Sequence, residues 1–179
     1  MPFVILAVAV VLIIVIALIS ISNKLNRALV KIDEAESGID VALTKRYDVL
    51  TKQLDIVKGY AKHESETIER VIELRRGSSM AEKSAAAAAM NEMQAKINVV
   101  AEAYPELRSA ENFRMLQASV NDTEEHLQAA RRAYNANVSS FNQMIVSFPS
   151  SIVANSKGLS KRDFFEADPA KRTDVNMEF

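Results

Sequence analysis

Residues 113–148, FRMLQASVNDTEEHLQAARRAYNANVSSFNQMIVSF, carry an apolar or aromatic residue at every seventh position. This column consists of Phe113, Val120, Leu127, Tyr134, Phe141 and Phe148, and its companion three positions on contains Leu116, Ala130 and Met144. The combined spacing is that of the a and d positions of a packed helix face. We therefore predict one long helix over residues 109–148, with Ser109 as its N-cap and Pro149 as its end.

The stretch from Phe3 to Ile21 is apolar except for Ser20. As a helix it would be about 28 Å long, close to the ~30 Å hydrocarbon core of a bilayer. The alternative is a cleaved signal peptide, because Ser20 and Ser22 form a small-x-small pair. However, no Lys or Arg precedes the run, and it is longer than the roughly 7–15 apolar residues of a signal peptide. We expect an uncleaved transmembrane anchor over residues 1–22.

Three basic residues, Lys24, Arg27 and Lys31, directly follow the apolar run. The flank of a membrane span that is richer in Lys and Arg usually faces the cytoplasm. We therefore expect the N-terminus outside and the remainder of the chain in the cytoplasm. The same side chains can also reach the lipid headgroups, so the bilayer itself is an expected partner.

Two more helical patterns lie between the anchor and the long helix. Apolar residues recur at steps of three, four and seven from Leu25 to Val71, and they predict a helix from residue 23 to residues 75–76. Gly77 follows as a C-terminal cap, and Gly38 is the expected kink, whereas Gly59 need not interrupt the helix.

A second helix is predicted over residues 80–104, because Ser79 and Glu82 form a capping box at its start. With connections as short as residues 77–78 and 105–108, neighbouring helices should run antiparallel. The fold class is all-α: a single transmembrane helix followed by an antiparallel bundle of long helices, in part a coiled coil. The expected domains are the anchor at 1–22, the bundle at 23–149 and a partly ordered tail at 150–179.

The predicted 80–104 helix is too short to cover its two longer neighbours. Either a second copy of the chain or the tail must therefore bury the end of the long helix. The tail could do so with Ile152, Val153, Phe164 and Phe165. The candidate surface for self-association or partner contact comprises Tyr134, Phe141, Ile145 and Phe148.

Known catalytic and ligand-binding motifs are missing from the sequence. It has no cysteine and only four glycines, and no Gly-rich phosphate loop or nucleophile elbow occurs. His63 and His126 lie on different predicted helices, and the HExxH zinc motif lacks its second histidine. We expect no enzyme, no catalytic residue, no metal and no cofactor. A net charge of −1, without a basic stripe interleaved with aromatic residues, gives no reason to expect nucleic acid.

Two polar features lie near the predicted packing faces. Residues 45–48, Lys-Arg-Tyr-Asp, favour an ion pair within the bundle over a ligand site. Asn135 and Asn142 stand beside the aromatic column, where they either fix register through an interhelical hydrogen bond or lie on half-exposed surface.

Several strings, taken in order, resemble the LemA family of bacterial membrane-anchored helical proteins. They are Lys45-Arg46-Tyr47-Asp48, residues 57–64 (VKGYAKHE), 101–107 (AEAYPEL), 111–113 (ENF), 130–135 (ARRAYN), Val138, Phe141-Asn142 and 147–150 (SFPS). The sequence departs from the family pattern at residues 50–52, where the family often has Ile-Pro-Asn, and at Glu36, where an aromatic residue is common.

The resemblance implies a bacterial single-pass membrane protein with a short N-terminus outside, a cytoplasmic helical bundle and no established catalytic residues. Relatives in the family include a protein involved in building magnetosome membranes, and others are linked to envelope proteases. We expect a helical scaffold or self-assembling organiser at the cytoplasmic membrane face, as a homo-oligomer. The alternative is a monomeric adaptor that binds another membrane protein, such as an envelope protease.

Overall fold

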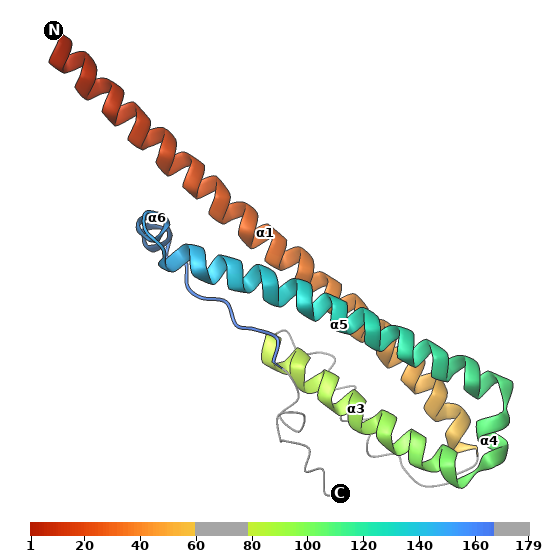
Figure 1. The fold of residues 1–179 in the computed structure, drawn as a ribbon. Coiled ribbons are helices and arrows are strands. Elements are labelled where there is room, and N and C mark those ends of the chain that lie inside the picture. The colour runs from red at the N-terminus through yellow and green to blue at the C-terminus, as the bar shows by residue number, and fades with distance from the viewer. Residues whose placement is uncertain (60–78, 167–179) are drawn as a thin grey trace, which may run out of the picture. The chain divides into compact units, whose positions relative to one another are not determined.

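A computed structural model describes residues 1–59 and 79–166 of the chain. Within those ranges the chain forms helices, without any strand (Figure 1). The helices are α1 (Pro2–Lys58), α3 (Met80–Ala103), α4 (Pro105–Ser109), α5 (Glu111–Val146) and α6 (Ser150–Ser156). The predicted all-α class, with one long apolar N-terminal helix followed by a bundle, is confirmed.

Helix α1 runs from the apolar stretch into the bundle without interruption. It is continuous at Gly38, where the sequence suggested a kink. It ends at Lys58, where the Gly59 amide donates to the Ile56 carbonyl at 3.2 Å in a tight turn. The prediction that the helix would continue through Gly59 was wrong, which is consistent with the low helix propensity of glycine. The predicted helix end at residues 75–77 lies outside the described residues.

The described chain divides into two compact units, and both long helices contribute to each. The first unit comprises Met1–Glu36 and Ala133–Asp163. The second comprises Ser37–Arg132 together with the chain from Phe164. We describe each unit separately.

Helix α5 runs antiparallel to α1 in the second unit. Arg46 of α1 contacts Glu124 of α5, with Nη1 and Oε2 2.9 Å apart. Seven residues later on α1, Gln53 donates from Nε2 to Oε1 of Gln117 at 2.6 Å, seven residues earlier on α5. Two polar contacts one heptad apart therefore set the register of these helices.

Helix α3, in contrast, runs in the same direction as α1 (Figure 1). Asp40 pairs with Lys83, and Arg46 further along α1 donates to Asn91 further along α3. The prediction that these two helices are antiparallel was wrong. The physical reason is the length of the connection: α1 ends at Lys58, so residues 59–79 join the helices instead of a two-residue loop.

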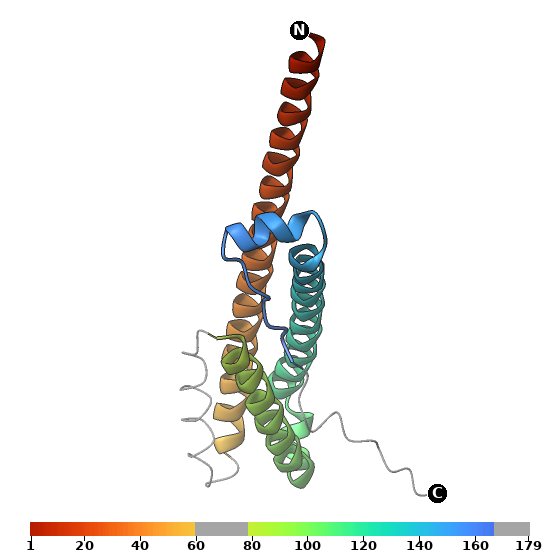
Figure 2. The ribbon, with the colours of Figure 1, turned by 90° about the vertical axis from the view of Figure 1, so that its left-hand side faces the viewer.

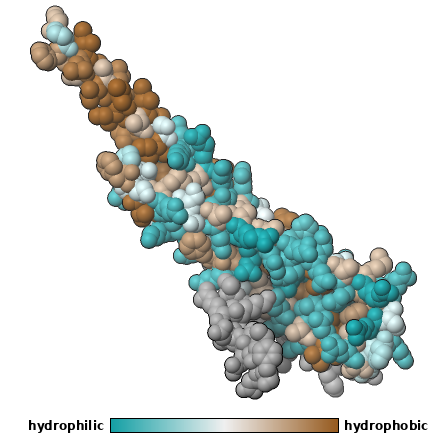
Figure 3. All heavy atoms as spheres, viewed as in Figure 1, coloured by the Kyte–Doolittle hydropathy of each residue, from teal (hydrophilic) through white to brown (hydrophobic). Residues whose placement is uncertain are grey.

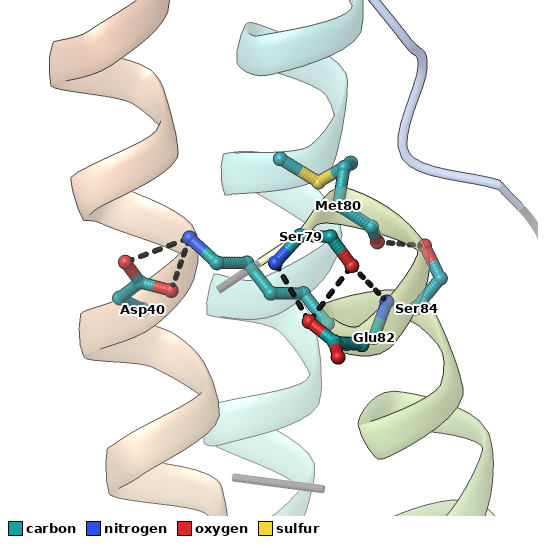
Figure 4. A network of polar contacts seen from close by, with 6 residues as sticks. Asp40, Ser79, Met80, Glu82 and Ser84 are labelled. Atoms are coloured by element: carbon teal, nitrogen blue, oxygen red, sulfur yellow. Dashed lines mark hydrogen bonds and ion pairs between the residues drawn. The ribbon is translucent and has the colours of Figure 1, made fainter. Parts of the chain in front are cut away.

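The start of α3 has the predicted capping box (Figure 4). Ser79 Oγ accepts from the Glu82 amide at 3.2 Å, and the Ser79 amide donates to Glu82 Oε2 at 2.9 Å. One residue further, Lys83 Nζ lies 2.7 Å from Asp40 Oδ1 of α1. The cap and the ion pair together fix where α3 begins against α1.

Helix α5 begins two residues later than predicted. Ser109 ends the short helix α4, and its hydroxyl donates to the Glu106 carbonyl at 2.9 Å instead of capping α5. The extended Ala110 takes the capping position, and its carbonyl accepts from the Arg114 amide at 3.1 Å. A short helix therefore replaces the predicted loop at residues 105–108.

The heptad column of α5 forms core in both units. In the second unit the buried apolar residues include Ile39, Leu43, Leu50, Val57, Met90, Met93, Ile97, Leu107, Phe113, Val120 and Leu127. In the first unit they are Leu25, Ile32, Tyr134, Val138, Phe141, Ile145, Val153 and Ala154. The predicted column is confirmed from Phe113 through Phe141, but Phe148 is 82% exposed.

Candidate functional site

The apolar part of α1 is a membrane-spanning candidate. It is the only helix in the described ranges that is long and apolar enough to cross a bilayer. Its most apolar 18-residue window has a mean hydropathy of 3.6 and is not covered by other parts of the chain. In Figure 3 apolar residues cover most of the visible face of this end of the helix, whereas polar residues dominate the visible surface beyond it. A fully exposed apolar helix is suited to lipid on all sides.

The three basic residues predicted to flank the membrane are all exposed on α1. Lys24, Arg27 and Lys31 are spaced three and four residues apart, so they share one face of the helix. Leu25 and Ile32, on the neighbouring face, are buried in the first unit. The helix therefore changes at its exit from the apolar run, from apolar all round to amphipathic with a basic stripe.

The four residues predicted to contact a partner behave differently from one another. Tyr134, Phe141 and Ile145 are at most 7% exposed and belong to the chain's own core. They are therefore not available as a direct contact surface, which corrects the candidate surface predicted from the sequence. Phe148 alone is exposed, because α5 ends at Val146 and the chain turns before Pro149.

The tail helps to cover the core residues at this end of α5. Tyr134 donates its hydroxyl proton to the Asp163 carbonyl at 2.9 Å. Asn142 donates to the Arg162 carbonyl and accepts from the Arg162 amide, both at 2.9 Å. The Asn142 side chain thus makes two hydrogen bonds with the backbone of one tail residue. Val153 of α6 is buried in the same unit. These contacts match the tail-capping alternative of the sequence analysis.

In the second unit the tail also docks through one aromatic ring. Phe165 is 2% exposed, and the Arg131 guanidinium carbon lies 4.7 Å from the ring centroid. This is a cation–π distance. The neighbouring Phe164 remains 47% exposed, so only one of the two aromatic residues has the docking role predicted for the pair.

A buried charged cluster lies on the α1–α3–α5 contact of the second unit. Arg46 is 3% exposed, and its Nη2 donates to Asn91 Oδ1 at 2.7 Å while Nη1 pairs with Glu124. Its Nε has no partner within the described part of the chain. Burial lowers the pKa of the Arg46 guanidinium, Glu124 opposes that shift and the positive charge of Arg131 adds to it. The ion pair within the bundle predicted for residues 45–48 is confirmed.

The partners of Arg46 were missed by the sequence analysis, although a signal for them was present. Beside the aromatic column of α5 runs a second column at seven-residue spacing, which changes from polar to apolar along the helix. Its members are Gln117, Glu124, Arg131, Val138 and Ile145. A polar stretch within a packing face indicates buried polar layers.

A metal site finds no support in the described ranges, where no three His, Cys, Asp or Glu side chains are grouped closely enough to hold an ion. His126 lies 3.5 Å from Asp122 Oδ1, one helical turn earlier, with both side chains exposed. His63 lies outside the residues that the structure describes.

Comparison with known proteins gives one family. The LemA family model matches residues 35–179. Protein LemA of Metamycoplasma hominis is 27% identical over 159 residues, which cover 86% of this chain and 73% of that protein. The match therefore includes the bundle, the tail and the polar layers.

Magnetosome proteins are partial matches. MamQ of Magnetospirillum gryphiswaldense is 25% identical over 80 residues, and MamQ 2 of Paramagnetospirillum magneticum is 26% identical over 80 residues. Each match covers 45% of this chain and 29% of the magnetosome protein. The chain thus spans less than a third of their length.

Proposed function

The chain belongs to the LemA family, and from that premise we propose that it is a membrane-anchored helical scaffold that assembles with copies of itself at the cytoplasmic face of the membrane. The observation that carries this proposal is the continuity of α1. One helix supplies both the apolar membrane segment and the first helix of the bundle, with no linker between them. The bundle is thereby kept at the membrane surface.

Confinement to the bilayer plane favours lateral association, because anchored copies meet at a high effective concentration. The apolar segment is exposed all round, so it is free to contact other spans as well as lipid. The partial similarity to magnetosome proteins supports a role at a membrane. We assign no catalytic activity to the chain, because its sequence lacks the catalytic motifs discussed above.

A second candidate is a monomeric adaptor that binds another membrane protein. The observation in its favour is the burial of Phe141 and Ile145 within the chain. The short 80–104 helix leaves a second copy or the tail to cover these residues, and the contacts of Asn142 and Tyr134 with the tail supply one form of cover. A chain that covers its own apolar core needs no copy for that purpose.

Cross-linking in native membranes distinguishes these two candidates. A single cysteine at the exposed residue Val41 gives a unique cross-linking site, because the natural chain has none. For the scaffold we expect cross-linked species of two or more copies, and multimers by mass after mild solubilisation. The control variant places the cysteine at the buried Leu50, which should not cross-link. Monomers alone in full-length protein, with aggregation only after removal of residues 150–179, would favour the adaptor.

Membrane orientation can be tested at Ser160, which is exposed in the tail. The positive-inside rule predicts that Ser160→Cys is shielded from an impermeant thiol reagent in intact cells and is labelled after lysis. Pro2→Cys, at the other end of the apolar segment, is the matched control and should be labelled in intact cells. Labelling of Ser160→Cys before lysis would reverse the proposed orientation.

A further inference from the structure

We propose that the membrane-facing end of α5, the turn after it and α6 form a second membrane contact, which lies in the headgroup region of a bilayer containing anionic lipid, beside the exit of α1. We call Val146, Phe148 and Ile152 the tip surface. This contact goes beyond the proposed scaffold function. It does not depend on which side of the membrane the bundle lies.

The first argument is position, and it uses only residues of the first unit. Asn137 of α5 donates to the Lys31 carbonyl of α1 at 3.0 Å. From there to Val146 is a rise of about 14 Å along α5, and the same rise back along α1 reaches Ser22. The end of α5 therefore lies level with the end of the apolar run at Ile21, and Phe148 comes after it.

An independent contact places α6 at the same level. Lys157, directly after α6, donates from Nζ to Asn26 Oδ1 of α1 at 2.9 Å. Figure 2 shows α6 lying across the direction of α1, close to the end of the apolar segment. If α1 crosses the bilayer, α6 lies along its surface, which is the arrangement of interfacial helices.

The second argument is exposure. Val146 is 60% exposed, Phe148 82% and Ile152 56%, whereas Val153 and Ala154 of α6 face the core. These three large apolar side chains fall within seven consecutive residues. In water they would form an unfavourable exposed cluster, but in the headgroup region their burial against lipid is favourable.

The third argument is charge. Residues 1–32 and 133–162 contain six basic residues and no Asp or Glu, and the four acidic residues of the first unit, Asp33, Glu34, Glu36 and Asp163, all follow these stretches. The six are Lys24, Arg27, Lys31, Lys157, Lys161 and Arg162, and all are exposed. Exposed apolar side chains in stretches whose only charged residues are basic match the surface of an anionic bilayer. The same tip surface on a second copy would bring like charges together, which disfavours a self-contact.

Tryptophan fluorescence in proteoliposomes tests the proposal, because the natural chain has no tryptophan. The full-length Phe148→Trp variant is reconstituted in vesicles of phosphatidylcholine with phosphatidylglycerol. We expect its emission to be shifted to the blue and quenched by lipids brominated near the headgroup end of the acyl chain. Val99→Trp on α3, at a residue 67% exposed, is the matched control and should be quenched by iodide but not by bromolipid.

Two further arms identify what covers the tip surface. Replacing Lys157, Lys161 and Arg162 by Gln, or omitting phosphatidylglycerol, should weaken the bromolipid quenching of Phe148→Trp. Diluting the protein in lipid should leave the quenching unchanged. Emission and iodide quenching equal to those of Val99→Trp would overturn the proposal. Shielding that disappears on dilution would also overturn it, since that result identifies a second copy as the cover.

Discussion

Phe141→Ala is expected to lower the free energy of unfolding by about 3–5 kcal/mol, because it removes a whole aromatic ring from a packed core. Phe141 is 0% exposed in the first unit, and the next residue, Asn142, holds the tail backbone with two hydrogen bonds. A backbone tied down at that point has little freedom to collapse into the space left by the ring. The loss should therefore lie toward the upper end of this range.

The sequence offers its own control for this substitution. Phe148 occupies the next position of the same heptad column but is 82% exposed. We expect Phe148→Ala to change the unfolding free energy by no more than about 0.5 kcal/mol. Both variants are compared with the natural chain by denaturant unfolding of the full-length protein in the same detergent, followed by helix content. Equal losses for the two variants would contradict the burial of Phe141 in the core.

The contrast between Phe141 and Phe148 also marks the limit of sequence reasoning for the core. Seven-residue spacing predicted the packing face of α5 correctly through five positions, because a helical period depends on local geometry alone. Whether the sixth position is covered depends on where the chain goes after Pro149. In the structure α5 has already ended, and the tail contacts Asn142 and Tyr134 instead.

The relative direction of two helices was predictable only where the length of the connection between them was predicted correctly. The capping box at Ser79 and Glu82 gave the start of α3 correctly, since it depends on four consecutive residues. The shared direction of α1 and α3 was not predictable from the apolar pattern, which continued past Gly59. Ion pairs such as Asp40–Lys83 join residues 43 positions apart, and no local pattern reports them.

For the candidate site, the membrane-spanning candidate and its basic flank could be predicted from the sequence, because hydropathy and charge order are properties of a short stretch. The partner surface could not be obtained in this way. Tyr134 and Phe148 are aromatic residues of the same heptad column. Only the fold shows that Tyr134 is buried in the core and that Phe148 is exposed.

Arg46→Ala is expected to cost about 3–5 kcal/mol of unfolding free energy, because it leaves a partly buried carboxylate without its partner. The Glu124 side chain is 25% exposed and pairs with Arg46 at 2.9 Å, and Asn91 loses its donor as well. Lys45→Ala is the matched control on the adjacent residue. Its ion pair with Asp122 joins side chains that are 53% and 56% exposed, and such pairs contribute about 0–1 kcal/mol.

Removal of both charges distinguishes two quantities. One is the cost of leaving a lone carboxylate buried, and the other is the stability that the intact ion pair contributes. The double variant Arg46→Met with Glu124→Gln should recover a large part of the stability lost in Arg46→Ala, because no unpaired charge remains and the methionine fills part of the volume. Arg46 Nε already lacks a partner among the described residues, so the natural pair is not fully compensated. Denaturant unfolding of these three variants and of the natural chain gives the comparison. If Arg46→Ala costs no more than Lys45→Ala, the cluster is open to water and cannot determine the register of α1 against α5.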